Sequence, residues 1–196
     1  MKRYSLVLFL LFAFAKADFS KAQQVQTVKM EQEERVNASD FPKSAVQLLS
    51  QITKTDQQIK YYKETDGYLT SYEAKYKRRG RRYSAEFNEL GLLIDIEKDI
   101  KKKEIKKVAF ELIKKELHKI AQQYKIEKVQ EQYLINEQNP SSITLQIDNN
   151  EFDNYELIVA FKENRKIYRK EMLYSKEGIL IRQRNVKRLE YDFILF

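Results

Sequence analysis

The order of apolar and polar residues divides the chain into segments with a helical period and segments with a period of two. The first helical segment begins at Asp40-Phe41-Pro42, because a proline fits the first turn of a helix, where its missing N–H would have no partner. Apolar residues then recur on one helical face: Phe41, Ala45, Leu48, Leu49 and Ile52. The pattern predicts a helix that ends between residues 53 and 56.

From residue 59 the period changes to two, which is typical of strands with one buried and one solvated face. Tyr72, Ala74 and Tyr76 alternate with polar residues, and the alternation continues through residues 83–87 and 92–96. Glycines 67, 80 and 91 separate these segments, and glycine adopts the positive φ angles that tight hairpins need. We expect four antiparallel strands whose apolar face packs on the helix and buries Tyr72, Tyr76 and Tyr83.

A second set of the same elements follows the basic stretch 101–104. Seven apolar residues lie at helical spacing between Ile105 and Tyr124, which predicts a second helix. Alternating segments predict further strands at residues 126–135, 143–147, 155–162, 165–174 and 179–186. Residues 136–154 form a longer insertion. The apolar, aromatic residues 189–196 predict an added strand or a segment docked elsewhere.

Short motifs recur at a spacing close to 85 residues. Leu90-Gly91-Leu92 and Glu177-Gly178-Ile179 are 87 residues apart, and Tyr76-Lys77 and Phe161-Lys162 are 85 residues apart. This period is too long for a solenoid and suits a small domain that is present twice. The predicted fold class is α+β with two tandem units, residues 38–100 and 101–196, each with one helix on one face of a four-stranded antiparallel sheet.

The leading residues predict export. Lys2 and Arg3 precede the apolar run Leu6–Ala15, which is too short to span a bilayer. Small residues before position 23 suit a signal peptidase, so residues 1–22 are the expected signal peptide; cleavage after Ala17 is the alternative. Residues 23–37 are then a flexible leader or a short first strand. We expect a periplasmic or secreted protein with no stable membrane insertion after cleavage.

Several of these motifs together resemble the PepSY-like secreted proteins of Gram-negative envelopes, which share their helix-plus-four-strand unit with the beta-lactamase-inhibitor-like proteins. The residues that carry the resemblance are Pro42, Asp66-Gly67, Tyr72-Glu73 and Leu90-Gly91-Leu92 in the first unit, and Tyr155-Glu156 and Gly178-Ile179-Leu180 in the second. Asn88 stands where an aspartate is common. The resemblance implies the fold and an envelope compartment, and a role in restraining an envelope enzyme or in sensing a ligand through the sheet.

Composition argues against several other functions. Residues 1–22 carry four basic residues and one acidic residue, so their removal lowers the formal net charge from +8 to +5, which is too weakly basic to predict a nucleic-acid partner. The chain has no cysteine and one histidine, His118, on the expected polar face of the second helix. No frame for a catalytic nucleophile or a phosphate loop is present. The oxygen-rich loop 148–154 lacks the EF-hand spacing and is interpreted as solvated. We expect no catalytic residue, metal or cofactor.

Two local features are candidates for binding a partner. Arg78, Arg79, Arg81 and Arg82 crowd one hairpin tip, where they could bind carboxylates or phosphates, although a solvated turn explains them as well. The chain also has 13 tyrosines and no tryptophan. Tyrosines that point outward are enriched at interfaces. The candidates are Tyr61 or Tyr62, since neighbours in a strand face opposite ways, and Tyr68 beside a turn.

The leading functional hypothesis is therefore a non-enzymatic module that presents the uncovered sheet face to a partner protein, possible roles being inhibition or modulation of an envelope enzyme. The expected contacts are Tyr61, Tyr62, Tyr68, Arg78, Arg79, Arg81 and Arg82. The alternative hypothesis is a carrier or sensor of a small anionic or lipid ligand. An enzyme is the least supported class, because it needs convergent titratable groups in a cleft.

Overall fold

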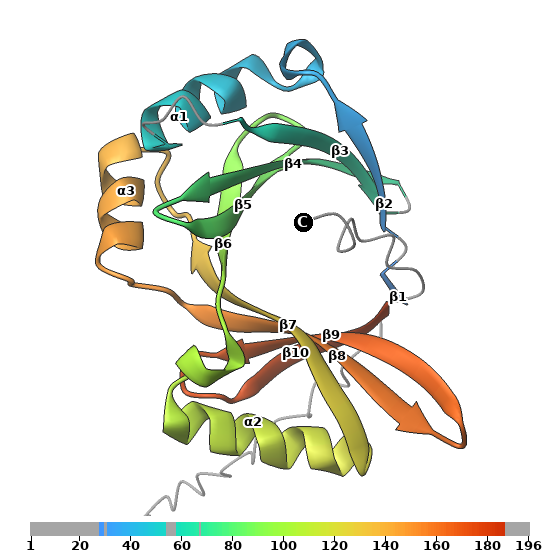
Figure 1. The fold of residues 1–196 in the computed structure, drawn as a ribbon. Coiled ribbons are helices and arrows are strands. Elements are labelled where there is room, and N and C mark those ends of the chain that lie inside the picture. The colour runs from blue at the N-terminus through green and yellow to red at the C-terminus, as the bar shows by residue number, and fades with distance from the viewer. Residues whose placement is uncertain (1–27, 30, 54–57, 67, 187–196) are drawn as a thin grey trace, which may run out of the picture.

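The computed structural model describes residues 28–29, 31–53, 58–66 and 68–186. The first half contains one α-helix followed by four strands (Figure 1): α1 Lys43–Thr53, β3 Lys60–Asp66, β4 Leu69–Arg78, β5 Arg81–Asn88 and β6 Leu93–Asp99. These elements agree with the helix and strands predicted from the apolar periods. The expected signal peptide, residues 1–22, and the expected last strand, residues 189–196, lie outside the described residues.

The second half repeats the order of one helix and four strands, with an additional helix after the first strand. Its elements are α2 Lys107–Ile120, β7 Gln123–Leu134, α3 Pro140–Asp148, β8 Asn154–Glu163, β9 Lys166–Ser175 and β10 Leu180–Val186. Short 3₁₀ turns at Ala38–Asp40 and Lys102–Glu104 precede α1 and α2.

The strand predicted at residues 143–147 is wrong, because these residues belong to α3. Asn139 caps this helix by accepting hydrogen bonds from two backbone amides, and Pro140 occupies its first turn. Ile143 and Ile147 are buried on the same helical face while Leu145 is 61% exposed. The alternating apolar residues fit either period over so short a run, and the capping residues favour the helix.

The expected flexible leader is also corrected for residues 28–29 and 31–36, which form two strands. β2 (Glu31–Val36) pairs antiparallel with β3, and β1 (Val28–Lys29) pairs parallel with β10. The short first strand that the sequence left open as an alternative is thus present. β1 and β2 form the two edges of the sheet.

All ten strands belong to one sheet, in the order β1-β10-β9-β8-β7-β6-β5-β4-β3-β2. β6 and β7 pair antiparallel across the predicted boundary at residues 100–101, so the two sets of four strands are joined edge to edge. The sheet curls until β1 and β2, which are consecutive in the chain, meet the strands at its opposite ends (Figure 1). The described strands therefore enclose a concave face.

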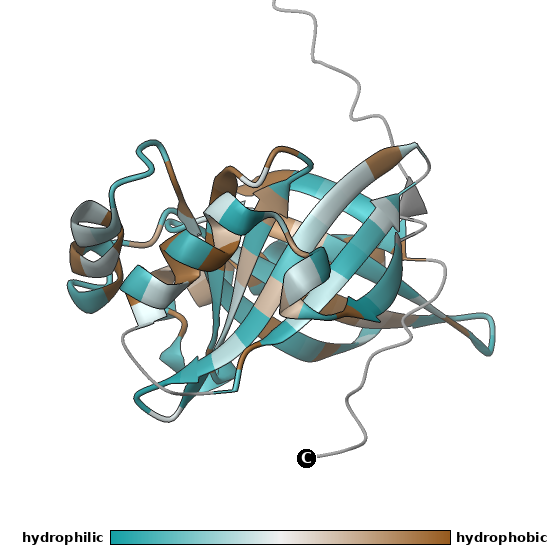
Figure 2. Ribbon diagram, turned by 90° about the horizontal axis from the view of Figure 1, so that it is seen from above, coloured by the Kyte–Doolittle hydropathy of each residue, from teal (hydrophilic) through white to brown (hydrophobic). Residues whose placement is uncertain are grey.

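The three helices cover the convex face, and α1 contacts α3 (Figure 1). Hydrophilic and hydrophobic residues alternate along the strands, as the period of two requires (Figure 2). The buried apolar residues form one connected core that spans both halves. Polar residues of the strands face the concave side of the sheet.

Matching aromatic pairs lie in the two halves of this core. Tyr76 and Tyr83 are stacked with ring centroids 5.5 Å apart, and Phe161 and Tyr168 are stacked at 5.6 Å. Each pair joins directly opposed residues of a hairpin, β4–β5 or β8–β9. Tyr72 packs at the edge of the same core. The three tyrosines expected on the helix-covered face are therefore located there.

The turns after β5 and β9 are built alike. In each, one side-chain oxygen accepts hydrogen bonds from the amides two and four residues later, at 3.0 Å and 3.0 Å for Asn88 and at 3.2 Å and 3.4 Å for Ser175. A glycine with positive φ follows, Gly91 at 76° and Gly178 at 91°. Each turn places its glycine against the start of a helix, α1 or α2.

Candidate functional site

The concave face of the sheet surrounds a cavity of about 530 Å³. Among the described residues, its lining includes eight acidic and seven basic side chains, which come from the strands β2 to β8 and from β10. Buried charges are costly unless they are paired or meet a ligand. The polar strand residues thus line a concave, partly open and strongly charged space instead of a flat solvated surface.

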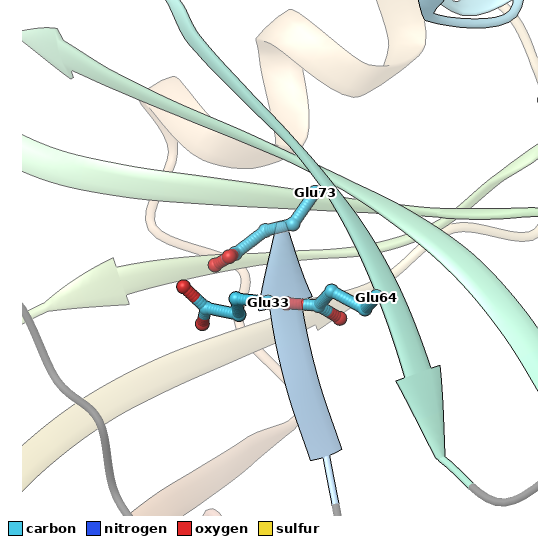
Figure 3. A group of neighbouring side chains, drawn as sticks. All are labelled: Glu33, Glu64 and Glu73. Atoms are coloured by element: carbon cyan, nitrogen blue, oxygen red, sulfur yellow. The ribbon is translucent and has the colours of Figure 1, made fainter. Parts of the chain in front are cut away.

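Three carboxylates gather where β2, β3 and β4 adjoin (Figure 3). Glu33 and Glu64 are directly opposed in β2 and β3, and oxygens of Glu33, Glu64 and Glu73 all lie within 4.8 Å of one another. The Nζ of Lys75 lies 3.0 Å from Glu33 Oε1, 2.7 Å from Glu73 Oε2 and 4.5 Å from the centre of the Tyr62 ring. A lysine ammonium of the chain itself therefore lies within this oxygen cluster.

Lys75 determines how the neighbouring carboxylate ionises. Burial alone would raise the pKa of Glu73, but the charge and hydrogen bond of Lys75 outweigh it and lower the pKa. Burial would likewise lower the pKa of Lys75, and the carboxylates of Glu73 and Glu33 outweigh it and raise the pKa. This part of the cavity contains a paired, permanently charged group.

Next to it, three acidic residues stand in register on three adjacent strands. Glu73 in β4 is directly opposite Glu86 in β5, and Glu86 is directly opposite Asp95 in β6. Ser84 donates a hydrogen bond to Glu73, and Gln132 donates one to Asp95 Oδ2 at 2.7 Å. Like charges directly opposed across a ladder destabilise a sheet. This arrangement therefore has no evident benefit for folding.

The Glu86–Asp95 pair holds its protons unusually tightly. Burial, followed by the carboxylates of Glu64 and Glu73, raises the pKa of Glu86 well above its usual range. Burial, followed by the carboxylate of Glu156, raises the pKa of Asp95 to about 7, although the hydrogen bond from Gln132 opposes the shift. At neutral pH Asp95 is thus close to a change of charge.

The predicted tyrosine contacts do not form one surface. Tyr61 packs against Phe41 with ring centroids 4.9 Å apart, on the helix-covered side. Tyr62 is 5% exposed and faces the cavity beside Lys75. Tyr68 is fully exposed at the turn between β3 and β4, at the opposite end of β4 from the basic hairpin. The structure therefore separates the three residues.

Acidic residues of other elements pair with the four arginines of the β4–β5 hairpin. These ion pairs offset the repulsion between the arginines. Arg78 is buried, whereas the other three are half-buried or exposed. The ion pairs are Arg78–Asp148 (2.7 Å), Arg79–Asp148 (3.0 Å), Arg81–Glu104 (2.7 Å) and Arg82–Asp99 (2.8 Å). The cluster attaches the hairpin to α3 and to the segment before α2.

The two remaining features noted in the sequence are His118 and the oxygen-rich loop 148–154. His118 is exposed on α2, with its ring 5.0 Å from that of Tyr124. In the loop 148–154, Asn150 Oδ1 accepts a hydrogen bond from a tyrosine hydroxyl at 2.9 Å, and Asp153 Oδ2 accepts one from a backbone amide at 2.8 Å. The loop oxygens therefore hold the loop in place.

Sequence reasoning missed the acidic residues of the concave face, although one signal was available. The two-residue turn at Arg79 and Gly80 sets the hairpin register, and counting back from it places Glu73 opposite Glu86. What the pattern could not reveal is that the polar face curves inward. On a flat sheet the same acidic residues would be exposed to solvent and would not indicate a site.

The fold is similar to those of several solved structures from Bacteroides. A DUF2874-family protein of Bacteroides ovatus superposes with a TM-score of 0.50 at 10% identity, covering 74% of this chain and 87% of that chain. A Bacteroides eggerthii protein whose name places it in the periplasm gives 0.48 at 12% identity, covering 74% and 88%. A BLIP-like protein of Bacteroides fragilis gives 0.47 at 12% identity, covering 76% and 88%.

These likenesses concern the fold. Two of these structures are named as a periplasmic and as a BLIP-like protein; for this chain the periplasmic location and the PepSY-like and beta-lactamase-inhibitor-like resemblance stay predictions. The sequence matches no protein-family model and no curated protein. Within the described part of the chain, no helix has the length and apolar character needed to cross a membrane.

Proposed function

We propose that this chain is an exported, non-enzymatic protein that holds a small polar ligand inside its curved sheet. The observation that carries the proposal is the partly open cavity of about 530 Å³ with a charged lining. Cavities of 300–1,000 Å³ are the usual size of small-molecule sites. The proposal corresponds to the carrier or sensor that the sequence offered as the alternative, with a different ligand.

The nature of the lining decides against the ligands first considered. A lipid needs an apolar cavity, and the apolar residues of the strands face the helices instead. An anion would meet the ladder Glu73, Glu86 and Asp95, whose carboxylates already repel one another. A ligand that carries positive charge, together with polar groups for the basic side chains of the lining, fits best.

A partner protein, and with it the modulation of an envelope enzyme, is the second hypothesis. Tyr68 and Leu69 favour it, because they are 107% and 75% exposed at the turn between β3 and β4, and neighbouring apolar side chains on a surface suit a protein contact. The basic hairpin contributes less, since each of its arginines has an acidic partner in the chain.

The proposal also includes an envelope location and an origin of the cavity from two copies of one unit. The apolar segment near the N-terminus and the names of fold neighbours support an envelope location. The matching turns at Asn88 and Ser175 support two copies of one helix-plus-four-strand unit. The two copies would together form a single binding chamber, to which each contributes half of the wall.

Thermal-shift screening of the mature protein against a panel of small amines, amino acids, sugars, organic acids and lipids tests the proposal. Saturable stabilisation by a polar compound is expected. It should be lost in Ser71→Trp, which fills the cavity beside Glu64, and retained in the control Ser50→Trp on the exposed side of α1. Binding that Ser71→Trp leaves intact, or stabilisation by lipids alone, would contradict it.

A further inference from the structure

This inference rests on the proposed ligand site in the cavity. Within that cavity, two neighbouring carboxylates could determine which ligand binds. We infer that Glu86 and Asp95 bind a primary ammonium group of a small organic ligand. The two side chains lie directly opposite each other on β5 and β6 and both line the cavity. Opposed residues on one face of an antiparallel pair have Cβ atoms about 5 Å apart, so a single ammonium group can reach both carboxylates.

Among the described residues, no basic side chain forms an ion pair with Glu86 or Asp95; the charge of Arg182 acts on Asp95 without such a contact. Asp95 is 8% exposed, and its Oδ1 is buried without a hydrogen-bond partner among the described residues. Its Oδ2 has only the neutral donor Gln132. Glu86 accepts one long hydrogen bond, 3.4 Å from the hydroxyl of Ser84. A buried carboxylate oxygen without a donor is costly, and a bound ammonium group would supply that donor.

The neighbouring cluster shows what a filled site of this kind looks like. Lys75 places its ammonium group between Glu33 and Glu73 and over the ring of Tyr62. An ammonium group has three donors and interacts favourably with carboxylates and aromatic faces. The lysine thus completes one pair of carboxylates, and Glu86 and Asp95 form the adjacent pair that the chain does not complete.

A divalent metal ion fits less well. In the part of the chain that the structure describes, the acidic group close enough to surround a metal is Glu33, Glu64 and Glu73, where Lys75 already lies. Ca²⁺ takes six to eight oxygen ligands, and Glu86 and Asp95 supply at most four. The cavity of about 530 Å³ is also far larger than an ion needs. An organic cation uses both the volume and the paired carboxylates.

The ammonium group would compete with protons. The charged groups that act on the pair are Glu64 on β3, Glu73 on β4, Glu97 on β6, Glu156 on β8 and Arg182 on β10. Four of these five are acidic, and with burial they favour the protonated pair at low pH. Because a cation binds the ionised carboxylates, its affinity should rise as the pH increases through 7.

Calorimetric titration of the mature protein with 1,4-diaminobutane at constant ionic strength tests the inference. Saturable binding is expected that strengthens about tenfold between pH 6 and pH 8. Neutral 1,4-butanediol, which has the same length, should not bind. The isosteric changes Glu86→Gln and Asp95→Asn should each weaken binding by at least about tenfold, and Glu89→Gln, at an exposed position in the turn after β5, should leave it unchanged.

Diamine binding that survives both substitutions would overturn the inference, and so would tighter binding of CaCl₂ that depends on the same two residues. A variant that fails to fold is recognised by its circular dichroism, and either of the two isosteric changes is then sufficient. If another polar ligand binds and is excluded by Ser71→Trp while the diamine does not bind, the ammonium inference fails and the proposed cavity function stands. If neither binds, both fail.

Discussion

Gly178, in the turn after β9, packs against the backbone of Ala109 in α2. A Cβ atom at this position would lie 2.8 Å from Ala109 Cα, and the φ angle of +91° is one that side-chain-bearing residues rarely adopt. Gly178→Ala should therefore lower the free energy of unfolding by about 3 kcal/mol, through backbone strain and displacement of the helix together. Urea denaturation measures the difference.

The matched control for this prediction is Gly80→Ala. Gly80 has a similar φ of +76°, but nothing lies within 4 Å of the added Cβ. This variant should lose only the strain contribution, about 1 kcal/mol. Equal losses at the two positions would mean that the close approach of the turn to α2 contributes nothing to stability.

The raised pKa of Asp95 predicts a pH dependence of stability. Burial, with the charge of Glu156, raises this pKa from 3.8 to about 7. Between these values the folded protein retains a proton that the unfolded chain has lost, so the contribution of Asp95 falls as the pH rises from about 4 to about 7. Asp95→Asn should gain stability relative to wild type across this window, by at most about 4 kcal/mol.

Chemical denaturation of both proteins at intervals from pH 4 to pH 8 checks the prediction. Glu86→Gln should show the same sign, because burial and the surrounding carboxylates raise the pKa of Glu86 as well. Glu89→Gln serves as the control, since Glu89 is exposed. A difference between Asp95→Asn and wild type that shrinks as the pH rises would contradict the assignment.

The ion pair between Arg78 and Asp148 should contribute to stability, because it joins the buried end of β4 to the end of α3. Arg78 is 9% exposed and its Nη2 lies 2.7 Å from Asp148 Oδ1. A double-mutant cycle with Arg78→Met and Asp148→Asn should give a coupling energy of about 1–3 kcal/mol. The more exposed pair Arg81–Glu104 provides the comparison, with an expected coupling below about 1 kcal/mol.

The side chains of Asn88 and Ser175 should stabilise their turns to a similar extent. Each accepts hydrogen bonds from two backbone amides, so Asn88→Ala and Ser175→Ala should each lower the free energy of unfolding by about 1 kcal/mol. Asn88→Asp should cost less than Asn88→Ala, because a carboxylate oxygen accepts the same two bonds. An Asn88→Asp variant that is no more stable than Asn88→Ala would count against this explanation.

Much of the secondary structure follows from the sequence for local reasons. The helical spacing of Leu48, Leu49 and Ile52 corresponds to the buried face of α1, and the turn at Arg79 and Gly80 lies where glycine indicated it. Asn164 and Arg165 form a turn with positive φ angles of 47° and 65° without any glycine, because the hairpin around them is long and well paired. The turn lies where the predicted strands 155–162 and 165–174 are separated, although no glycine marks it.

The candidate site could not be predicted in the same way, because it depends on curvature and on distant pairings. Alternation correctly assigned Glu73, Glu86 and Asp95 to the polar face of their strands, but a polar face is normally solvated. Its enclosure follows from the pairing of β6 with β7 and of β1 with β10, contacts between segments that no local pattern relates. The position of Tyr62 was ambiguous for a related reason, since neighbouring residues in a strand face opposite sides.

The ends of the sheet meet through one short stretch of chain, since Val28 of β1 pairs with Asn185 of β10 while the next strand, β2, pairs with β3. During synthesis β1 emerges early, and it cannot pair with β10 until almost all of the described chain has followed it. The pairing of β1 with β10, which brings the two ends of the sheet together, is therefore formed last.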